Sequence, residues 1–163
     1  MGKYSKKIIY KGELALELKD CLKHFIQLEL KAAKFYEEIA KNNKGEIAQV
    51  AKKFQKEETS HAQKLKELLT TAELVMDSTI NKEVLLMSQY GIDVNLFGKE
   101  LKVDTRKQLF TFALQAEKDS ILMYQELVSQ VPKNSKPYRL FSDLIKEERG
   151  HMFFILKQLH ELS

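Results

Sequence analysis

The sequence contains two similar pairs of helix-like segments, and this internal duplication restricts the fold more than any other feature. A shift of 88 residues places Glu117 on Glu29, and a shift of 90 residues places the EExxH motif ending at His151 on the one ending at His61. In all four segments the apolar residues recur at alternating steps of three and four, the spacing of one face of an α-helix. We therefore expect an all-α protein whose two halves are related by a pseudo-twofold axis.

The chain has few residues that break helices, with two Pro and six Gly in total. The spacing predicts helices over residues 13–41, 46–70 and 104–131. Pro132 and Pro137 bracket a short turn, after which a fourth helix follows. Four long helices of this kind are typical of a helix bundle.

The connection between the second and third predicted helices, residues 71–103, is too long for a tight turn. A helix of about 25 residues is roughly 37 Å long, and about 15 extended residues span that distance. The connection can return the chain to the opposite end, which gives a four-helix bundle with one long crossover and parallel second and third helices. The apolar stretch Val84–Tyr90 predicts a short extra helix, and Asp104 is the expected N-cap of the next long helix.

A chain of 163 residues with 44% hydrophobic and 31% charged residues is typical of a single globular domain, here residues 1–163. No apolar run approaches the roughly 18 residues of a spanning helix, so we expect no membrane association and a cytoplasmic location. The net charge of +4 equals the four lysines of the basic segment 1–12, which we expect to be flexible. Because the remainder is neutral and arginine is scarce, we do not expect nucleic-acid binding.

Six polar residues lie on the helix faces that should be buried. They are Glu29, Glu58, His61, Glu117, Glu148 and His151. Four ionised carboxylates would place a charge of −4 in the core, and burying a charge costs several kcal/mol unless it is paired or binds a cation. Two divalent cations would balance this charge. The alternative is a plain bundle with a buried network of Glu and His, which leaves the negative charge unneutralised.

The spacing of these residues also favours metal binding. Residues three apart share a helix face, so each ExxH motif presents one oxygen and one nitrogen ligand inward. Helices that supply Glu, ExxH, Glu and ExxH form the ligand arrangement of two-metal carboxylate bundles. Mixed carboxylate and imidazole ligands favour iron or manganese, and zinc is a further alternative. We expect two metal ions per chain.

Four further residues lie next to these candidate ligands. Tyr36 and Tyr124 are one heptad beyond Glu29 and Glu117 on the same face. They are either core residues or side chains whose hydroxyl donates to a ligand or takes part in redox chemistry. Glu57 and Glu147 precede the ligands of the EExxH motifs and point off the buried face. We interpret them as solvated residues or as partners of the ligands.

These motifs resemble the ferritin-like superfamily, and most of all the di-iron domain of rubrerythrins. The resemblance rests on Glu29 with Tyr36, EETSH at 57–61, AEKDS with Tyr124, and EERGH at 147–151. It implies two iron ions, with Glu58 and Glu148 as bridging ligands and Glu29 and Glu117 as terminal ligands. It also implies that His61 and His151 each bind one iron.

The resemblance further implies a non-haem di-iron oxidoreductase that reduces hydrogen peroxide or oxygen. Rubrerythrins commonly carry a rubredoxin segment with paired CxxC motifs, whereas this chain has one cysteine, Cys21. The electron donor is therefore expected to be a separate protein, and a homodimer is expected. Ser120 stands where rubrerythrins have an extra glutamate, which favours a symmetric six-ligand site. The alternative is a ferritin-like iron-storage protein with a ferroxidase centre.

Overall fold

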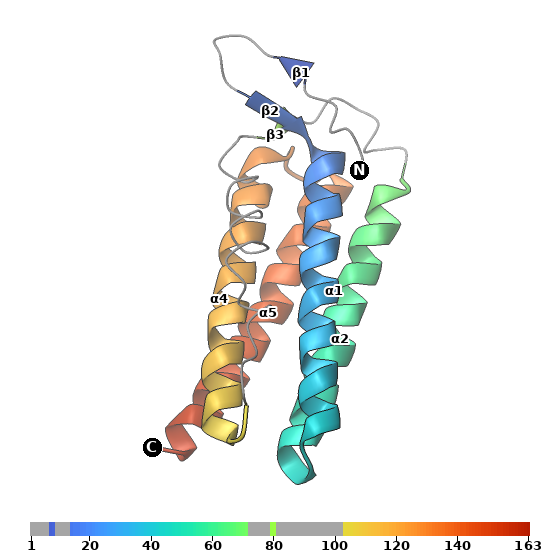
Figure 1. Ribbon diagram of the computed structural model, residues 1–163. Helices are drawn as coiled ribbons and strands as arrows, with labels where there is room; N and C mark the ends of the chain where they lie inside the picture. Colours follow the sequence, from blue (N-terminus) through green and yellow to red (C-terminus); the bar gives the residue numbers. More distant parts are fainter. Residues whose placement is uncertain (1–6, 9–13, 72–78, 81–102) are drawn as a thin grey trace.

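The computed structural model describes residues 7–8, 14–71, 79–80 and 103–163 (Figure 1). Four long helices dominate the described part of the chain. They are α1 Leu18–Asn42, α2 Gly45–Leu69, α4 Arg106–Gln130 and α5 Lys136–Glu161. The prediction of an all-α bundle of four helices is confirmed. The boundaries of α1, α2 and α4 agree with the predicted ones to within two residues except at the start of α1.

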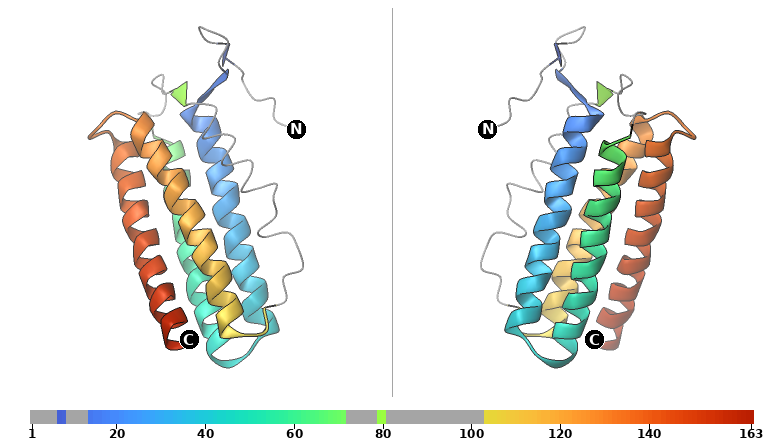
Figure 2. Two further views of the ribbon diagram at one scale, coloured as in Figure 1. Left: turned by 90° about the vertical axis from the view of Figure 1, so that its left-hand side faces the viewer. Right: turned by 90° about the vertical axis from the view of Figure 1, so that its right-hand side faces the viewer.

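The direction of the four helices confirms the predicted crossover. Figure 1 shows α1 running down from the end that carries β2 (Leu14–Glu17), α2 running up, α4 running up and α5 running down. The two further views in Figure 2 agree with this order of directions. Because α2 ends at one end of the bundle and α4 begins at the other, residues 71–103 connect two parallel helices. The predicted short helix Val84–Tyr90 lies outside the described residues.

Three short strands lie at the end of the bundle where α1 begins. Strands β1 (Lys7–Ile8), β2 and β3 (Thr79–Ile80) form antiparallel pairs in the order β1-β2-β3, and Leu16 pairs with Ile80. The expected first helix therefore begins at Leu18 rather than at residue 13. Pairing with two neighbouring strands satisfies the backbone of residues 14–17 and outweighs their local helix propensity.

The ends of the helices are fixed by local hydrogen bonds. Thr105 is the N-cap of α4, because its side chain accepts from the backbone N–H of Gln108 and the Gln108 side chain accepts from the backbone of Thr105. The expectation that Asp104 is the N-cap was wrong, since this reciprocal capping box satisfies two N–H groups at once. Gly45 at the start of α2 has φ +65°, a backbone conformation that glycine adopts without steric strain because it has no Cβ.

The apolar core forms two clusters along the length of the bundle, and each cluster contains residues of all four helices. The Leu22 cluster includes Leu18, Leu22, Phe25, Leu65, Leu68, Leu127, Phe141 and Leu144. The Phe110 cluster includes Ile39, Ala51, Phe54, Leu109, Phe110, Ala113 and Ile155. On every helix the buried Glu or His lies between the residues of the two clusters. The polar side chains therefore form a belt across the middle of the core.

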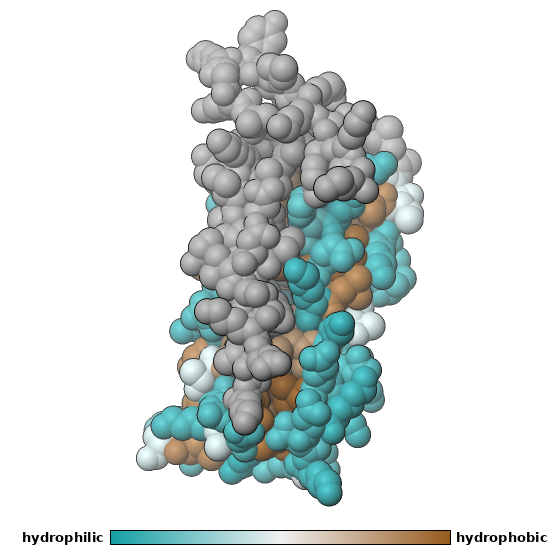
Figure 3. Space-filling model, viewed as in Figure 1, coloured by the Kyte–Doolittle hydropathy of each residue, from teal (hydrophilic) through white to brown (hydrophobic). Residues whose placement is uncertain are grey.

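Polar residues cover much of the outer surface of the helices. On the face seen in Figure 3, hydrophilic side chains predominate over the described helices, and apolar groups appear between them. None of the described helices combines the length and the hydropathy needed to cross a membrane. The apolar faces of these amphipathic helices are directed toward the two core clusters.

Candidate metal centre

The structure brings the six predicted ligands together in the polar belt. Glu29 comes from α1, Glu58 and His61 from α2, Glu117 from α4, and Glu148 and His151 from α5. All except His151 are buried, and His151 is half-buried. Their side chains form two groups in which the candidate ligand atoms lie within 4.8 Å of one another. Glu148 belongs to both groups, so the two groups are adjacent and share one carboxylate.

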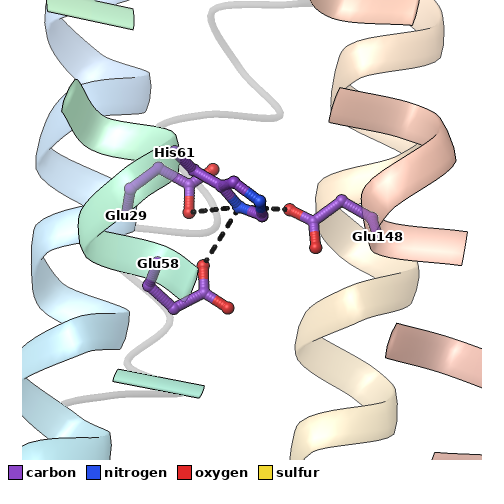
Figure 4. A group of neighbouring side chains, drawn as sticks. All are labelled: Glu29, Glu58, His61 and Glu148. Atoms are coloured by element: carbon purple, nitrogen blue, oxygen red, sulfur yellow. Dashed lines mark ion pairs between the residues drawn. The ribbon is translucent and has the colours of Figure 1, made fainter. Parts of the chain in front are cut away.

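The first group consists of Glu29, Glu58, His61 and Glu148 (Figure 4). His61 Nδ1 lies 3.2 Å from Glu148 Oε1, 3.7 Å from Glu58 Oε2 and 3.9 Å from Glu29 Oε2. Figure 4 shows the three carboxylates around the imidazole ring, with Glu148 approaching from the opposite helix pair. This group thus joins the two halves of the duplicated sequence.

The second group consists of Glu117, Glu148 and His151. His151 Nδ1 lies 3.3 Å from Glu148 Oε2 and 3.6 Å from Glu117 Oε2. The imidazole rings of His61 and His151 stack with their centroids 5.7 Å apart and an angle of 16° between their planes. The two histidines therefore face the shared carboxylate from corresponding positions, as the internal duplication predicts.

Each histidine directs its other ring nitrogen toward a glutamate of the opposite half. His61 Nε2 lies 3.2 Å from Glu147 Oε2, with hydrogen-bond geometry, and His151 Nε2 lies 3.5 Å from Glu57 Oε2. A carboxylate only accepts hydrogen bonds, so His61 Nε2 donates to Glu147, and Nδ1 is the ring nitrogen that faces the centre. The interpretation of Glu57 and Glu147 as partners of the ligands thus matches their positions. Each of these glutamates contacts the histidine of the other half, a long-range contact that no local spacing could predict.

The two tyrosines differ in their contacts although both are fully buried. The Tyr124 hydroxyl donates a hydrogen bond to Glu29 Oε1. The Tyr36 hydroxyl, which occupies the corresponding position in the first half, has no hydrogen-bond partner among the described residues. Tyr124 therefore holds a candidate ligand in place, whereas Tyr36 has a free donor next to the belt.

Burial raises the pKa values of the carboxyl groups in the belt. The pKa of Glu117 rises to about 9, because of its burial first and the neighbouring Glu148 next. The same two causes raise the pKa of Glu58 to about 7. For Glu29, burial and then the charge of Glu58 raise the pKa well above its usual value. In the absence of a cation, these groups reduce the negative charge of the belt by holding protons.

The pKa of His61 is also raised, so this side chain holds a further proton in the belt. Burial alone would lower it, but the Glu148 and Glu58 carboxylates outweigh burial and raise the pKa of His61 to about 12. A metal ion would take the place of such protons, since metal ligands bind in their deprotonated form.

The polar atoms of the belt fit a metal centre. Both carboxylate oxygens of Glu117 and of Glu148 are buried without a hydrogen bond to any described residue, and so is Nδ1 of both histidines. Buried polar atoms are normally paired, and atoms without a partner that converge on one place are satisfied by an ion. The donors are carboxylate oxygen and imidazole nitrogen, which suit iron and manganese.

This fold and this set of side chains define the class of ferritin-like bundles with a carboxylate and histidine centre. The sequence profile of the rubrerythrin family matches residues 20–105, and the chain belongs to this family. The predicted resemblance is therefore confirmed. The match covers α1 from its third residue, α2 and the connection as far as the N-cap of α4, so Glu29, Glu58 and His61 lie within it.

Solved structures include a similar fold. A crystal structure from Thermotoga maritima, provisionally described as a ferritin-like diiron-carboxylate protein, is 22% identical to this chain and has a TM-score of 0.67. The alignment covers 91% of this chain and 98% of the other. At this identity the similarity shows the fold. A comparison with curated proteins found no match.

Proposed function

We propose that this protein is a non-haem di-iron oxidoreductase that reduces hydrogen peroxide or oxygen with electrons from a separate donor protein. The observation that carries the proposal is the pair of ligand groups that share Glu148. Membership of the rubrerythrin family and the buried carboxylate and histidine donors support iron as the metal. Manganese or zinc could replace iron in the same ligand set. We also propose a homodimer and a cytoplasmic location.

Two iron ions, when bound, would supply the two electrons that convert hydrogen peroxide and two protons into two water molecules. Glu148 reaches both ligand groups and would hold the two positions together. Tyr124 fixes the orientation of Glu29, and Glu147 fixes the ring and the tautomer of His61. The buried belt excludes bulk water, which strengthens the electrostatic interactions within it.

The unpaired hydroxyl of Tyr36 gives this side chain a separate role in the proposal. Its pKa is raised well above the usual value, by burial first and then by Glu117, so the hydroxyl keeps its proton. Tyr36 Oη is therefore a neutral hydrogen-bond donor that can bind an oxygen atom of the substrate. Tyr124, whose hydroxyl is already bound to Glu29, acts by positioning that ligand.

The experiment that tests this function is anaerobic loading with Fe(II), followed by rapid mixing with hydrogen peroxide and with oxygen in separate runs. We expect two iron ions per chain, oxidation of both, and repeated turnover when a reductant and a one-electron carrier are added. A single oxidation that deposits ferric iron without repeated turnover, in a large multi-subunit shell, would favour iron storage instead. Native mass measurement provides that second readout.

The residue Ser120 allows the choice between peroxide and oxygen to be tested. It is half-buried and lies one helical turn after Glu117 on α4. Because the wild-type chain has no carboxylate there, we expect no seventh protein ligand and no exchange between a His and a Glu ligand during turnover. Ser120→Glu should raise the rate with peroxide relative to oxygen. An unchanged ratio would show that this position does not select the oxidant.

A further inference from the structure

The contacts around the two histidines are unequal, although the sequence duplication predicts them to be equivalent. Glu147, the partner of His61, contacts Lys64 through both oxygens, at 2.6 and 2.7 Å from Lys64 Nζ. Glu57, the partner of His151, has its nearest described lysine at 3.9 Å, namely Lys53. Glu57 Oε2 has no hydrogen bond, while Glu147 accepts from both Lys64 and His61.

The sequence itself contains the cause of this difference. At the offset of 90 residues that superposes the two EExxH motifs, the position of Lys64 corresponds to Phe154. Phe154 packs against the rings of Phe54 and Phe110, and Lys53 Nζ lies 4.5 Å from its ring centroid. The second half thus has an aromatic side chain where the first half has a cation, and among the described residues no lysine contacts Glu57 as closely as Lys64 contacts Glu147.

The burial, hydrogen bonding and number of candidate ligands also distinguish the first group, at His61, from the second group, at His151. His61 is 1% exposed and His151 is 15% exposed. In the first group Glu29 accepts a hydrogen bond from Tyr124, whereas in the second group neither oxygen of Glu117 is hydrogen bonded. The first group also has four candidate ligands and the second has three. The deeper burial and the hydrogen bond make the ligands of the first group better ordered before any metal binds, and the larger number of ligands gives an ion more donors there.

We propose that the two metal positions of this chain are inequivalent, that the position at His61 fills first, and that Lys64 is the positioning residue that makes it so. This inference rests on the proposed metal centre. Lys64 holds Glu147, Glu147 holds the ring of His61, and Nδ1 of His61 is thereby aimed at the three carboxylates before the ion arrives. Ligands that are already oriented lose less conformational freedom on binding, and partners of this kind change metal affinity by about 10 to 100-fold.

Lys64 acts through orientation rather than through stability. Its side chain and that of Glu147 are 36% and 41% exposed, and an exposed ion pair contributes little to folding stability. The loss of Lys64 should therefore change metal binding much more than it changes the unfolding of the metal-free chain.

The test is a titration of the metal-free, full-length protein with Co²⁺, followed by visible absorption and by competition with a chelator. We expect two binding steps in the wild type. Lys64→Met should weaken the first step by about ten-fold or more and leave the second unchanged, with little change in the melting temperature of the metal-free protein. Lys64→Arg should restore the first step. Lys53→Met removes the same charge next to Glu57 and should leave the first step unchanged.

Two ligand variants assign the steps to their positions. Glu29→Gln should remove the tighter step, and Glu117→Gln should remove the weaker one. Two equal steps in the wild type, or loss of the tighter step in Glu117→Gln, would overturn this inference while leaving a two-metal function intact. Equal effects of Lys64→Met and Lys53→Met would do the same. Absence of Co²⁺ binding would contradict the proposed function itself.

Discussion

The two buried tyrosines occupy corresponding positions, and their different contacts predict different effects on stability. Tyr124→Phe leaves an oxygen of Glu29 without its donor, which should lower the free energy of unfolding by about 1–3 kcal/mol. Tyr36→Phe removes a buried hydroxyl that has no partner in the described part of the chain, and should be neutral or stabilising. Urea unfolding of the two metal-free variants makes the comparison. Equal losses would mean that the Tyr36 hydroxyl has a partner in solution.

The carboxylates differ in how many ligand groups they reach. Glu148 belongs to both groups and Glu58 to the first, whereas the family resemblance implies that both bridge. We expect Glu148→Ala to lower the metal content from about two ions per chain to well below one, and Glu58→Ala to leave about one. Metal analysis after anaerobic loading measures this, with Glu37→Ala on the exposed side of α1 as the control. Loss of both ions from both variants would establish two bridging glutamates.

At the level of helices, the capping box at the start of α4 predicts which of two neighbouring residues matters. Thr105→Ala should cost about 1 kcal/mol of stability, because it removes the acceptor for the backbone of Gln108. In a chain of this size such a loss lowers the melting temperature by about 2–4 °C. Asp104→Ala is the matched control, since the Asp104 side chain is exposed and is not the cap. A larger effect of Asp104→Ala would reverse this assignment.

The sequence was sufficient to predict the helices and the six belt residues because both are local patterns. A helical face repeats every three or four residues, and a glutamate or histidine on an apolar face stands out without knowledge of its neighbours. The residues Glu29 and His151 could be named on this basis. Their convergence required one additional argument, the balance of buried charge.

The features that the sequence could not predict depend on contacts between distant residues. Lys64 is one of several lysines on α2, and only the approach of α5 shows that it binds Glu147. Residues 14–17 have good helix formers, yet they pair with β1 and β3. Thr105 and Asp104 are both suitable caps, and the choice between them depends on the side chain of Gln108.

For the whole molecule, the raised pKa values predict how stability depends on pH. The folded, metal-free chain holds protons on Glu117 and Glu58, whose pKa values rise from 4.5 to about 9 and about 7. The unfolded chain releases these protons, so the folded state binds more of them and its stability falls as the pH rises from 4.5 toward 9. Each such group contributes a slope of up to about 1.4 kcal/mol per pH unit.

Metal binding should remove most of this dependence, because the ion replaces the protons. We expect the difference in melting temperature between metal-loaded and metal-free protein to widen as the pH is raised through this range. Thermal unfolding at several pH values measures it. A difference that does not widen between these pH values would mean that the carboxylates are already ionised in the metal-free fold.

The division of the core into the Leu22 cluster and the Phe110 cluster has a consequence for local opening. Each cluster joins all four helices, so either one alone can keep its end of the bundle closed while the middle separates. Regions with few apolar contacts open first and exchange their amide hydrogens fastest. In the metal-free protein, amide exchange should thus be faster around Glu58 and Glu148 than in the helical segments that pack in either cluster. Loading with metal should slow amide exchange selectively in the middle of the helices, because the bound ions then hold the four helices together at the polar belt.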